Sequence, residues 1–200
     1  MRDRVIGICS SPNSKESTTL TALKAALKVC GQNGLKSQII ELSGLDIKGC
    51  TDCSGCRNQI RCSQKDDFEK TIIPILSQND IGGIIFASPV YFGGISSQMK
   101  AVMDRSIMFR RNGFKFHNVV AGAITVGHSR NGGQELATMD IVRNALIQGM
   151  IVVSDAPPTS HFGGSLWSGH DGGIEKDEAG LQTAVNLGKN ISELVNKLKS

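Results

Sequence analysis

Residues 4–19 read RVIGIC followed by SSPNSKESTT, which places a short apolar run directly before a loop rich in hydroxyl groups. The run Arg4–Cys9 is typical of a buried strand in a parallel sheet. Apolar side chains then recur at helical spacing over Thr18–Gln32, and Ser17 precedes them as an N-cap. A strand, a loop and a helix in this order predict an α/β fold that begins at the first residues.

The rest of the chain repeats this alternation. Because alternating strands and helices form a parallel sheet with helices on both faces, we expect a flavodoxin-like three-layer sandwich. Its five-stranded parallel sheet should have the order 2-1-3-4-5, with a cysteine-loop insertion after strand 2. Further strands are expected at 37–42, 81–87, 119–126 and 150–153, and further helices at 66–78, 96–108, 133–149 and 177–198. We expect one domain over residues 1–200, with a cysteine loop at 48–65 and a Gly-rich excursion at 156–176.

Composition excludes several classes of protein. The formal net charge is only +4, and no stripe of Lys and Arg alternates with aromatic residues, so no nucleic-acid partner is expected. The opening Met-Arg-Asp-Arg leads into a strand without an apolar leader, and no apolar run approaches about 20 residues. We therefore expect a cytoplasmic protein with no membrane partner. Its six cysteines should be thiols, with Cys9 and Cys30 buried singly.

The other four cysteines form the motif with the clearest chemistry. Cys50, Cys53, Cys56 and Cys62 have the spacing C-x2-C-x2-C-x5-C within a polar loop. Thiolates are soft ligands, and the short first steps resemble the run found in bacterial ferredoxins. This spacing predicts a [4Fe–4S] cluster. Nearby cations at Lys48, Arg57, Arg61 and Lys65 would offset its negative charge.

Two alternatives remain open for these cysteines. Structural zinc sites usually use two C-x2-C pairs separated by about 12–20 residues, and the second pair is missing here. Zinc is therefore favoured less than a cluster. Redox-active or structural thiols are the other alternative.

Three loops should lie at the ligand-binding edge of the predicted sheet, outside the carboxyl ends of its strands. The loop at 10–19 ends on a helix N-terminus, which suits a phosphate, but it carries neither dinucleotide fingerprint nor Walker loop. A monophosphate such as that of FMN fits it better. The loop at 88–94 contains Tyr91, Phe92 and two glycines, which let the backbone approach a flat ring. Glycines in the loop at 125–133 can present N–H groups to a ring edge.

A family resemblance is specific at this point. The stretch 88–93 (SPVYFG), followed by Ser96, Gln98, Lys100 and Asp104-Arg105, resembles the flavin loop of the NADPH-dependent FMN reductase superfamily. The four cysteines resemble the compact motif of its iron–sulfur flavoprotein branch. This resemblance covers nearly the whole chain and implies one FMN and one [4Fe–4S] cluster per subunit. It also implies a homodimer or homotetramer in which one subunit's cluster lies near another's flavin.

The resemblance also implies roles for individual residues. It assigns the cluster to the four motif cysteines, and it leaves no side chain with a catalytic role as acid, base or nucleophile. It assigns the phosphate to Ser10, Ser11, Asn13, Ser17, Thr18 and Thr19, the ribityl chain and ring to Pro89, Val90, Tyr91, Phe92 and Gly93, and the ring edge to Thr125, Gly127 and Gly132.

The expected activity is electron transfer between the cluster and FMN. The donor would be a ferredoxin-like protein, and the small-molecule acceptor a quinone, a peroxide or O2. A second hypothesis is an NAD(P)H-dependent FMN or quinone reductase whose cysteines bind zinc or shape the loop. A third is a non-catalytic redox carrier or sensor.

Overall fold

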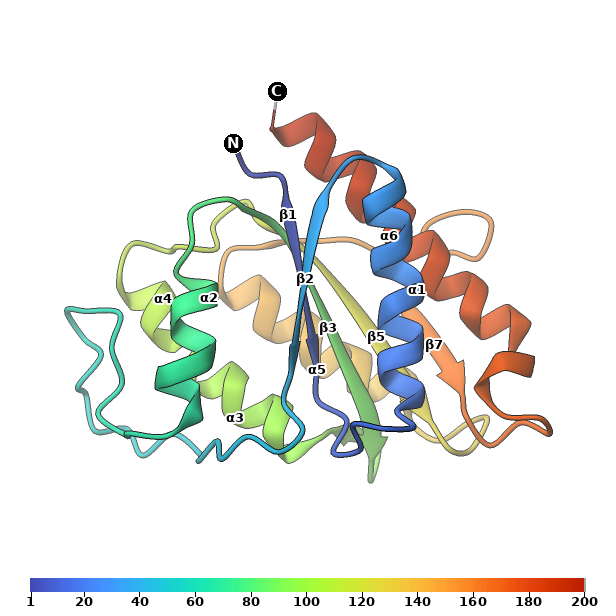
Figure 1. Ribbon diagram of the computed structural model, residues 1–200, viewed down its shortest axis with the longest axis horizontal. Helices are drawn as coiled ribbons and strands as arrows, with labels where there is room; N and C mark the ends of the chain where they lie inside the picture. The colour runs from blue at the N-terminus through green and yellow to red at the C-terminus, as the bar shows by residue number, and fades with distance from the viewer. Residues whose placement is uncertain (200) are drawn as a thin grey trace.

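The computed structural model describes residues 1–199 and contains a central twisted sheet with helices on both faces (Figure 1). The sheet has seven strands, and its main path runs β2-β1-β3-β5-β6. The strands are β1 (Arg4–Cys9), β2 (Lys36–Glu41), β3 (Ile81–Tyr91), β4 (Gly94–Ile95), β5 (Val120–Gly127), β6 (Ile151–Val152) and β7 (Gly164–Trp167). All neighbours on the main path pair in parallel.

The predicted sheet is confirmed in part. The five expected strands are present, and they follow the expected order once β4 is set aside. The five-stranded count was too small, because β4 and β7 add two strands. β4 arises from a hairpin in which Tyr91 pairs with Gly94 across a two-residue turn. Phe92 and Gly93 both have positive φ there, at 49° and 77°. Such a turn normally carries Asn-Gly or Gly-Gly, so Phe92 gave no indication of a hairpin.

The expected Gly-rich excursion at 156–176 is not a simple loop, because its middle residues form β7 and rejoin the sheet. β6 pairs with Val120 and Ala121 of β5, while β7 pairs with the later residues of the same strand, from Ile124 to Gly127. The chain after β6 therefore leaves the edge of β5 and rejoins it further along. A Cβ at Gly163 would lie 2.4 Å from the Ala123 carbonyl oxygen, so glycine is needed where the chain rejoins β5.

Helices cover both faces of the sheet, in separate groups (Figure 1). The first group is α1 (Thr18–Gln32) and α6 (Glu178–Leu198). The opposite face carries η1 (Phe68–Ile72), α2 (Ile73–Leu76), α3 (Ser97–Arg105), α4 (Ile107–Arg111) and α5 (Gln134–Ile147), and a short η2 (Ile174–Lys176) precedes α6. Each face has its own buried apolar cluster. No helix within residues 1–199 is long and apolar enough to span a membrane.

Two predicted helices differ from the observed ones. The helix expected at 66–78 is a π-helical turn that continues into the short α2, with Pro74 in the first turn of α2. The helix expected at 96–108 is divided at Ser106 into α3 and α4. The Ser106 hydroxyl donates to the Met103 carbonyl, a side-chain bond of the kind that bends helices.

Candidate functional site

Three loops meet at the carboxyl edge of the sheet, along the lower edge of the molecule in Figure 1. Ser96, the N-cap of α3, joins the first two of them. Its hydroxyl donates to Ser10 Oγ over 2.8 Å, and its N–H donates to Ser88 Oγ over 3.0 Å. The loop after β1 and the loop after β3 are therefore fixed to each other through buried hydroxyl groups.

The third loop, after β5, is organised by the side chain of Gln134. The Gln134 amide donates to the Ser129 carbonyl over 2.7 Å and accepts the Gly132 N–H over 2.8 Å. A Cβ at Gly127 would lie 2.5 Å from Gln134 Nε2, so the glutamine requires glycine at that position. Gln134 was missed by the sequence analysis, because a glutamine at a helix start has no distinctive local pattern.

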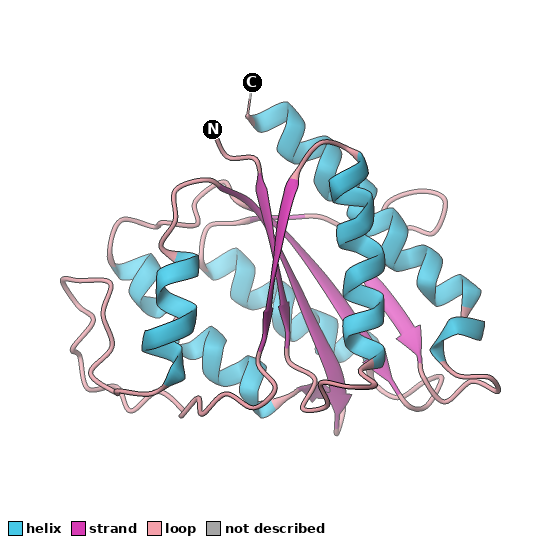
Figure 2. Ribbon diagram, in the orientation of Figure 1, coloured by secondary structure: helices cyan, strands magenta, loops and turns pink. Residues whose placement is uncertain are grey.

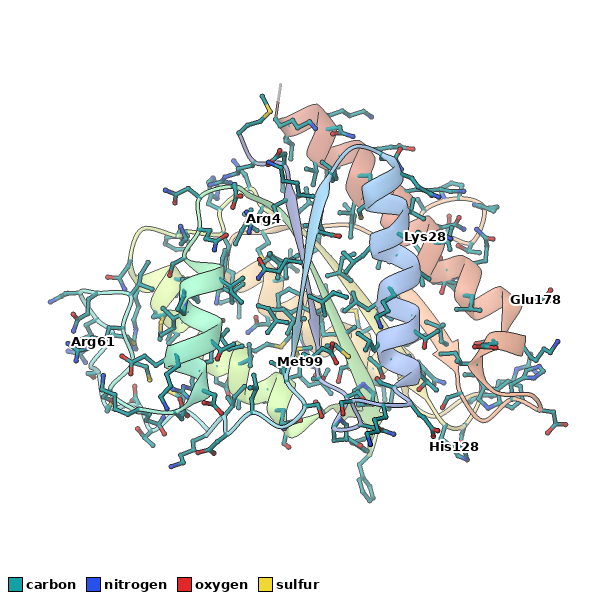
Figure 3. All side chains as sticks on the ribbon, in the orientation of Figure 1. Arg4, Lys28, Arg61, Met99, His128 and Glu178 are labelled. Atoms are coloured by element: carbon teal, nitrogen blue, oxygen red, sulfur yellow. The ribbon has the colours of Figure 1, made fainter. Side chains whose placement is uncertain are left out.

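The second and third loops touch directly. A Cβ at Gly133 would lie 2.6 Å from the Cα of Gly93, so the two backbones pack against each other. Figure 3 shows His128 of the third loop on this lower edge. The three loops that the sequence analysis selected are therefore adjacent in space.

The six predicted phosphate-binding residues differ in how accessible their side chains are to a ligand. Ser10 and Ser17 are buried, and their hydroxyls already bond within the protein, Ser17 as the N-cap that accepts the Leu20 N–H over 3.0 Å. Thr19 is also buried. Asn13 is exposed, and its side chain accepts the N–H groups of the two residues that follow Ser14. The remaining two, Ser11 and Thr18, are buried and half-buried respectively.

The start of α1 fits a phosphate. The first N–H groups of a helix have no partner within the helix, and α1 has no acidic residue in its first turn. Glu16, whose carboxylate would repel a phosphate beside it, is exposed and precedes the N-cap. Backbone N–H groups at Thr18 and Thr19, rather than many hydroxyls, are therefore the main donors that the structure offers to this ligand.

The predicted ring-binding residues present an aromatic surface beside that helix. Pro89, Val90 and Gly93 are half-buried, Tyr91 is 50% exposed, and Phe92 is fully exposed. Phe92 has a φ of 49°, a left-handed conformation that is strained for a bulky residue. An exposed and strained aromatic residue next to a phosphate-type helix terminus fits a ligand with a flat ring, as FMN has.

The predicted ring-edge residues lie at the end of β5 and in the loop behind it. The Thr125 hydroxyl is buried between α5 and the sheet, where it donates to the Gln134 carbonyl and bonds to Thr138. Thr125 also pairs with Ser88 of β3 and with Ser165 of β7 in the sheet, and its side chain is not free for a ligand. The carbonyl of Gly127 accepts the Ser168 N–H over 2.8 Å, which ties the segment after β7 to this loop.

The four motif cysteines line one pocket, between the loop after β2 and α4. Figure 2 shows this loop without helix or strand, and Figure 3 places Arg61 at its outer end. Cys62 is buried, Cys56 is half-buried, and Cys50 and Cys53 are exposed. Cys9 and Cys30 are buried elsewhere as single thiols, as expected.

The sulfurs of the motif do not form a ready site for a single metal ion. Within residues 1–199, no three His, Cys, Asp or Glu side chains converge closely enough to hold one metal ion. A tetrahedral zinc site with Zn–S bonds of about 2.3 Å would bring its sulfurs to about 3.8 Å from one another. In a [4Fe–4S] cluster each cysteine binds a different iron, so the sulfurs lie further apart. Four cysteines around one shared pocket are the donor set that a cluster would use.

Arg105 at the end of α3 connects the cysteine loop to the body of the protein. It donates to Cys62 Sγ over 3.1 Å, to Asp66 Oδ1 over 2.8 Å and to the Lys48 carbonyl over 3.1 Å. Burial alone would raise the pKa of Asp66, but the hydrogen bonds and charge of Arg105 outweigh it and hold that pKa below its ordinary value. Burial likewise opposes the charge on Arg105, yet Asp66 and Cys62 raise the pKa of Arg105.

Two further side chains, Arg111 and Ser63, reach other sulfurs. Arg111 donates to Cys56 Sγ over 3.4 Å, and Asn112 donates to the Cys56 carbonyl over 3.0 Å. The Ser63 hydroxyl lies 2.8 Å from Cys53 Sγ, and this bond holds the pKa of Cys53 below its ordinary value.

The cations that contact sulfur are not those that the sequence analysis chose. Lys48 lies 3.9 Å from Asp46, and Arg61 and Lys65 both pair with Glu69. Arg105 and Arg111 take the expected role, because α3 and α4 pack against the loop from a distant part of the sequence. No local pattern indicated this role for Arg105, because its partners are distant in the chain.

Known proteins resemble this chain over most of its length. A family model described as NADPH-dependent FMN reductase matches residues 4–163. An iron–sulfur flavoprotein of Methanocaldococcus jannaschii is 41% identical over 98% of this chain and 99% of its own length. An iron–sulfur flavoprotein of Methanosarcina thermophila is 35% identical over 96% of this chain and 95% of its own length. Among solved structures, a WrbA-like flavodoxin of Agrobacterium tumefaciens has a TM-score of 0.65 at 15% identity and 98% coverage of both chains, which supports the fold alone.

Proposed function

Because this chain belongs to the NADPH-dependent FMN reductase family, and within it to the iron–sulfur flavoproteins, we propose that it transfers electrons between a [4Fe–4S] cluster and FMN. The chain is an FMN-dependent oxidoreductase. One observation carries the proposal: all four cysteines of the motif line one pocket, into which Arg105 also projects. Thiolates gathered beside a fixed cation are the environment that an anionic cluster needs.

The residues proposed to hold FMN lie on the three joined loops. The N–H groups at the start of α1 would bind the phosphate, with Ser11 and Asn13 beside them, while Ser10 and Ser17 hold the loop in shape. The β3–β4 hairpin, 89–93, would line the ribityl chain and the ring. Thr125, Gly127 and Gly132 would face the ring edge. Every one of these roles needs the fixed loop geometry that Ser96 and Gln134 maintain.

Cys50, Cys53, Cys56 and Cys62 are the proposed cluster ligands. When bound, FMN takes up one or two electrons and the cluster exchanges one at a time, so the pair would couple a one-electron donor to a two-electron acceptor. The donor we propose is a ferredoxin-like protein, and the acceptor is a quinone, a peroxide or O2. No side chain is assigned a proton-transfer or nucleophilic role.

A second candidate activity is supported by the description of the matching family, which names NADPH. In this alternative the chain is an NAD(P)H-dependent FMN or quinone reductase, and its cysteines shape the loop or bind zinc. Rapid reduction of the bound flavin by NADPH alone, without a protein donor, would favour it.

Self-association is part of the proposal. The helix α5 exposes Leu136, Leu146 and Ile147, each more than half accessible. Contiguous exposed apolar patches mark contact surfaces, and Leu146 with Ile147 is the candidate patch on α5. We propose that the chain, acting as a single domain of residues 1–200 in the cytoplasm, forms a homodimer or homotetramer. Sedimentation analysis of the purified protein measures which of these it forms.

Anaerobic purification followed by iron, sulfide, zinc and flavin analysis tests the proposed function. We expect about four irons and one FMN per chain. One zinc per chain without sulfide would support the alternative reductase and exclude the cluster. Steady-state reduction of a quinone by reduced ferredoxin, compared with NADPH, then separates the two donors.

A further inference from the structure

Arg105 is the largest fully buried side chain of the described residues, and only 2% of it is exposed. A buried guanidinium is unfavourable unless its N–H groups find acceptors. Its Nη1 and Nη2 groups do so at Asp66, Lys48 and Cys62. The contact with Cys62 is unusual because the acceptor is a sulfur that we propose as a cluster ligand.

One donor of Arg105 is left over. Nε is buried and has no hydrogen-bond partner among the described residues. In a guanidinium group, the Nε–H and one Nη2–H lie on the same edge, and Nη2 is the nitrogen that donates to the Cys62 sulfur. The unused Nε–H therefore lies on the edge that Nε shares with Nη2. Arg105 lines the same pocket as the four cysteines.

The position of Arg105 is fixed from three sides. Asp66 binds the other edge of the guanidinium through both carboxylate oxygens and also accepts the Lys48 N–H over 3.1 Å. The Phe68 ring lies 4.3 Å from the guanidinium carbon. At the far end of α3, Ser96 is bonded to the loops proposed to hold FMN. An arginine held in this way presents its charge to Cys62 in one geometry.

We propose that Arg105 is a positioning residue that raises the reduction potential of the cluster, by donating to the Cys62 sulfur and holding a positive charge beside it. This inference rests on the proposed function. When the cluster accepts one electron from its donor, the donor is oxidised by one electron, no bond is formed or broken, and the cluster becomes more negative. Hydrogen bonds and positive charge at the ligand sulfurs stabilise the more negative state, so they favour reduction.

The test compares variants of opposite sign in the cluster-loaded protein. Arg105→Gln removes the charge and the donor fork, so the potential should fall. The equilibrium constant for one-electron reduction of the cluster should fall by about tenfold, which is about 59 mV. Asp66→Asn leaves Arg105 but removes the anion that neutralises it, so the potential should rise. Arg105→Lys keeps the charge and loses the fork, and its potential should lie between those of Arg105→Gln and the unaltered protein.

Arg111→Gln is the matched control. Arg111 also donates to a cysteine sulfur, but over 3.4 Å from a side chain that is 28% exposed. Solvent screens such a charge, so the potential of this variant should change by less than a third of the change for Arg105→Gln. Potentials are measured by anaerobic redox titration with the cluster followed by electron paramagnetic resonance.

The outcomes separate the inference from the proposed function. If the unaltered protein contains no iron and sulfide, the proposed function fails and the inference fails with it. If it contains the cluster, equal potentials for the unaltered protein and Arg105→Gln overturn the inference alone. Shifts of the same sign in Arg105→Gln and Asp66→Asn also overturn it, because they indicate disruption of the loop. If Arg105→Gln loses its iron, the potentials of Asp66→Asn and Arg105→Lys test the inference instead. Potentials equal to that of the unaltered protein in both variants refute the proposed role of Arg105.

Discussion

Replacing Ser96 by alanine should weaken both the fold and FMN binding. The Ser96 hydroxyl is buried, accepts the Met99 N–H over 3.3 Å as the N-cap of α3, and donates to Ser10 Oγ over 2.8 Å. Loss of an N-cap costs about 1 kcal/mol, and loss of the second hydrogen bond costs about 1 kcal/mol. The free energy of unfolding should therefore fall by about 2 kcal/mol, and the Tm by about 4–8 °C for a chain of this size.

The effect on FMN follows from the bond to Ser10. That bond holds the loop after β1 against the loop after β3 before any ligand arrives. If ligand binding must instead supply its contribution of about 1 kcal/mol, the Kd for FMN rises about fivefold. Urea unfolding of the apoprotein, followed by circular dichroism, measures the first effect. Quenching of flavin fluorescence on titration with apoprotein measures the second.

Ser192→Ala is the control for this experiment. Ser192 is also buried, but its hydroxyl donates within α6 to the Gly188 carbonyl, on the face of the sheet opposite to α3. Its unfolding free energy should change by less than about 1 kcal/mol, and its Kd for FMN should stay the same. The reasoning is refuted if Ser96→Ala matches the unaltered protein in stability, or if its Kd changes no more than that of Ser192→Ala.

Three further experiments test the remaining features. Cys50→Ala and Cys56→Ala should lose iron and ferredoxin-dependent activity while retaining FMN, and retention of the full iron content would contradict their role as ligands. Gly127→Ala should raise the Kd for FMN, because the new methyl group collides with the Gln134 amide. The double variant Gly127→Ala with Gln134→Ala should bind FMN no better, since it loses the hydrogen bonds that Gln134 makes in the loop. Full recovery of the Kd in the double variant would show that the Gln134 amide has no organising role. The lowered pKa of Asp66 stabilises the apoprotein above the unfolded-state pKa of about 3.9, and this contribution is lost as pH falls through the lower folded-state pKa. Urea unfolding across acidic pH should therefore show a shallower loss of stability for Asp66→Asn, and identical slopes would contradict the assignment.

Local patterns in the sequence were sufficient for much of the fold. Arg4–Cys9 and Thr18–Gln32 were predicted with the bounds that the structure has, and Ser17 was predicted as the N-cap. These features depend on side chains only a few positions apart, and each pattern stabilises its element on its own. The grouping of Cys50, Cys53, Cys56 and Cys62 was equally local, because short gaps alone bring the four sulfurs to one loop.

Other features depended on pairs of residues that are distant in the chain. Arg105 is 39 positions from Asp66 and 43 from Cys62, and only the packing of α3 against the cysteine loop brings them together. The return of β7 to β5 was missed because a strand at 164–167 is defined by its partner, not by its own short pattern. The sequence alone therefore predicted the motifs that carry the candidate chemistry and the main alternation of strands and helices. The tertiary structure decided which charges and amides hold the two sites in place, because such contacts form only when the whole sheet has assembled.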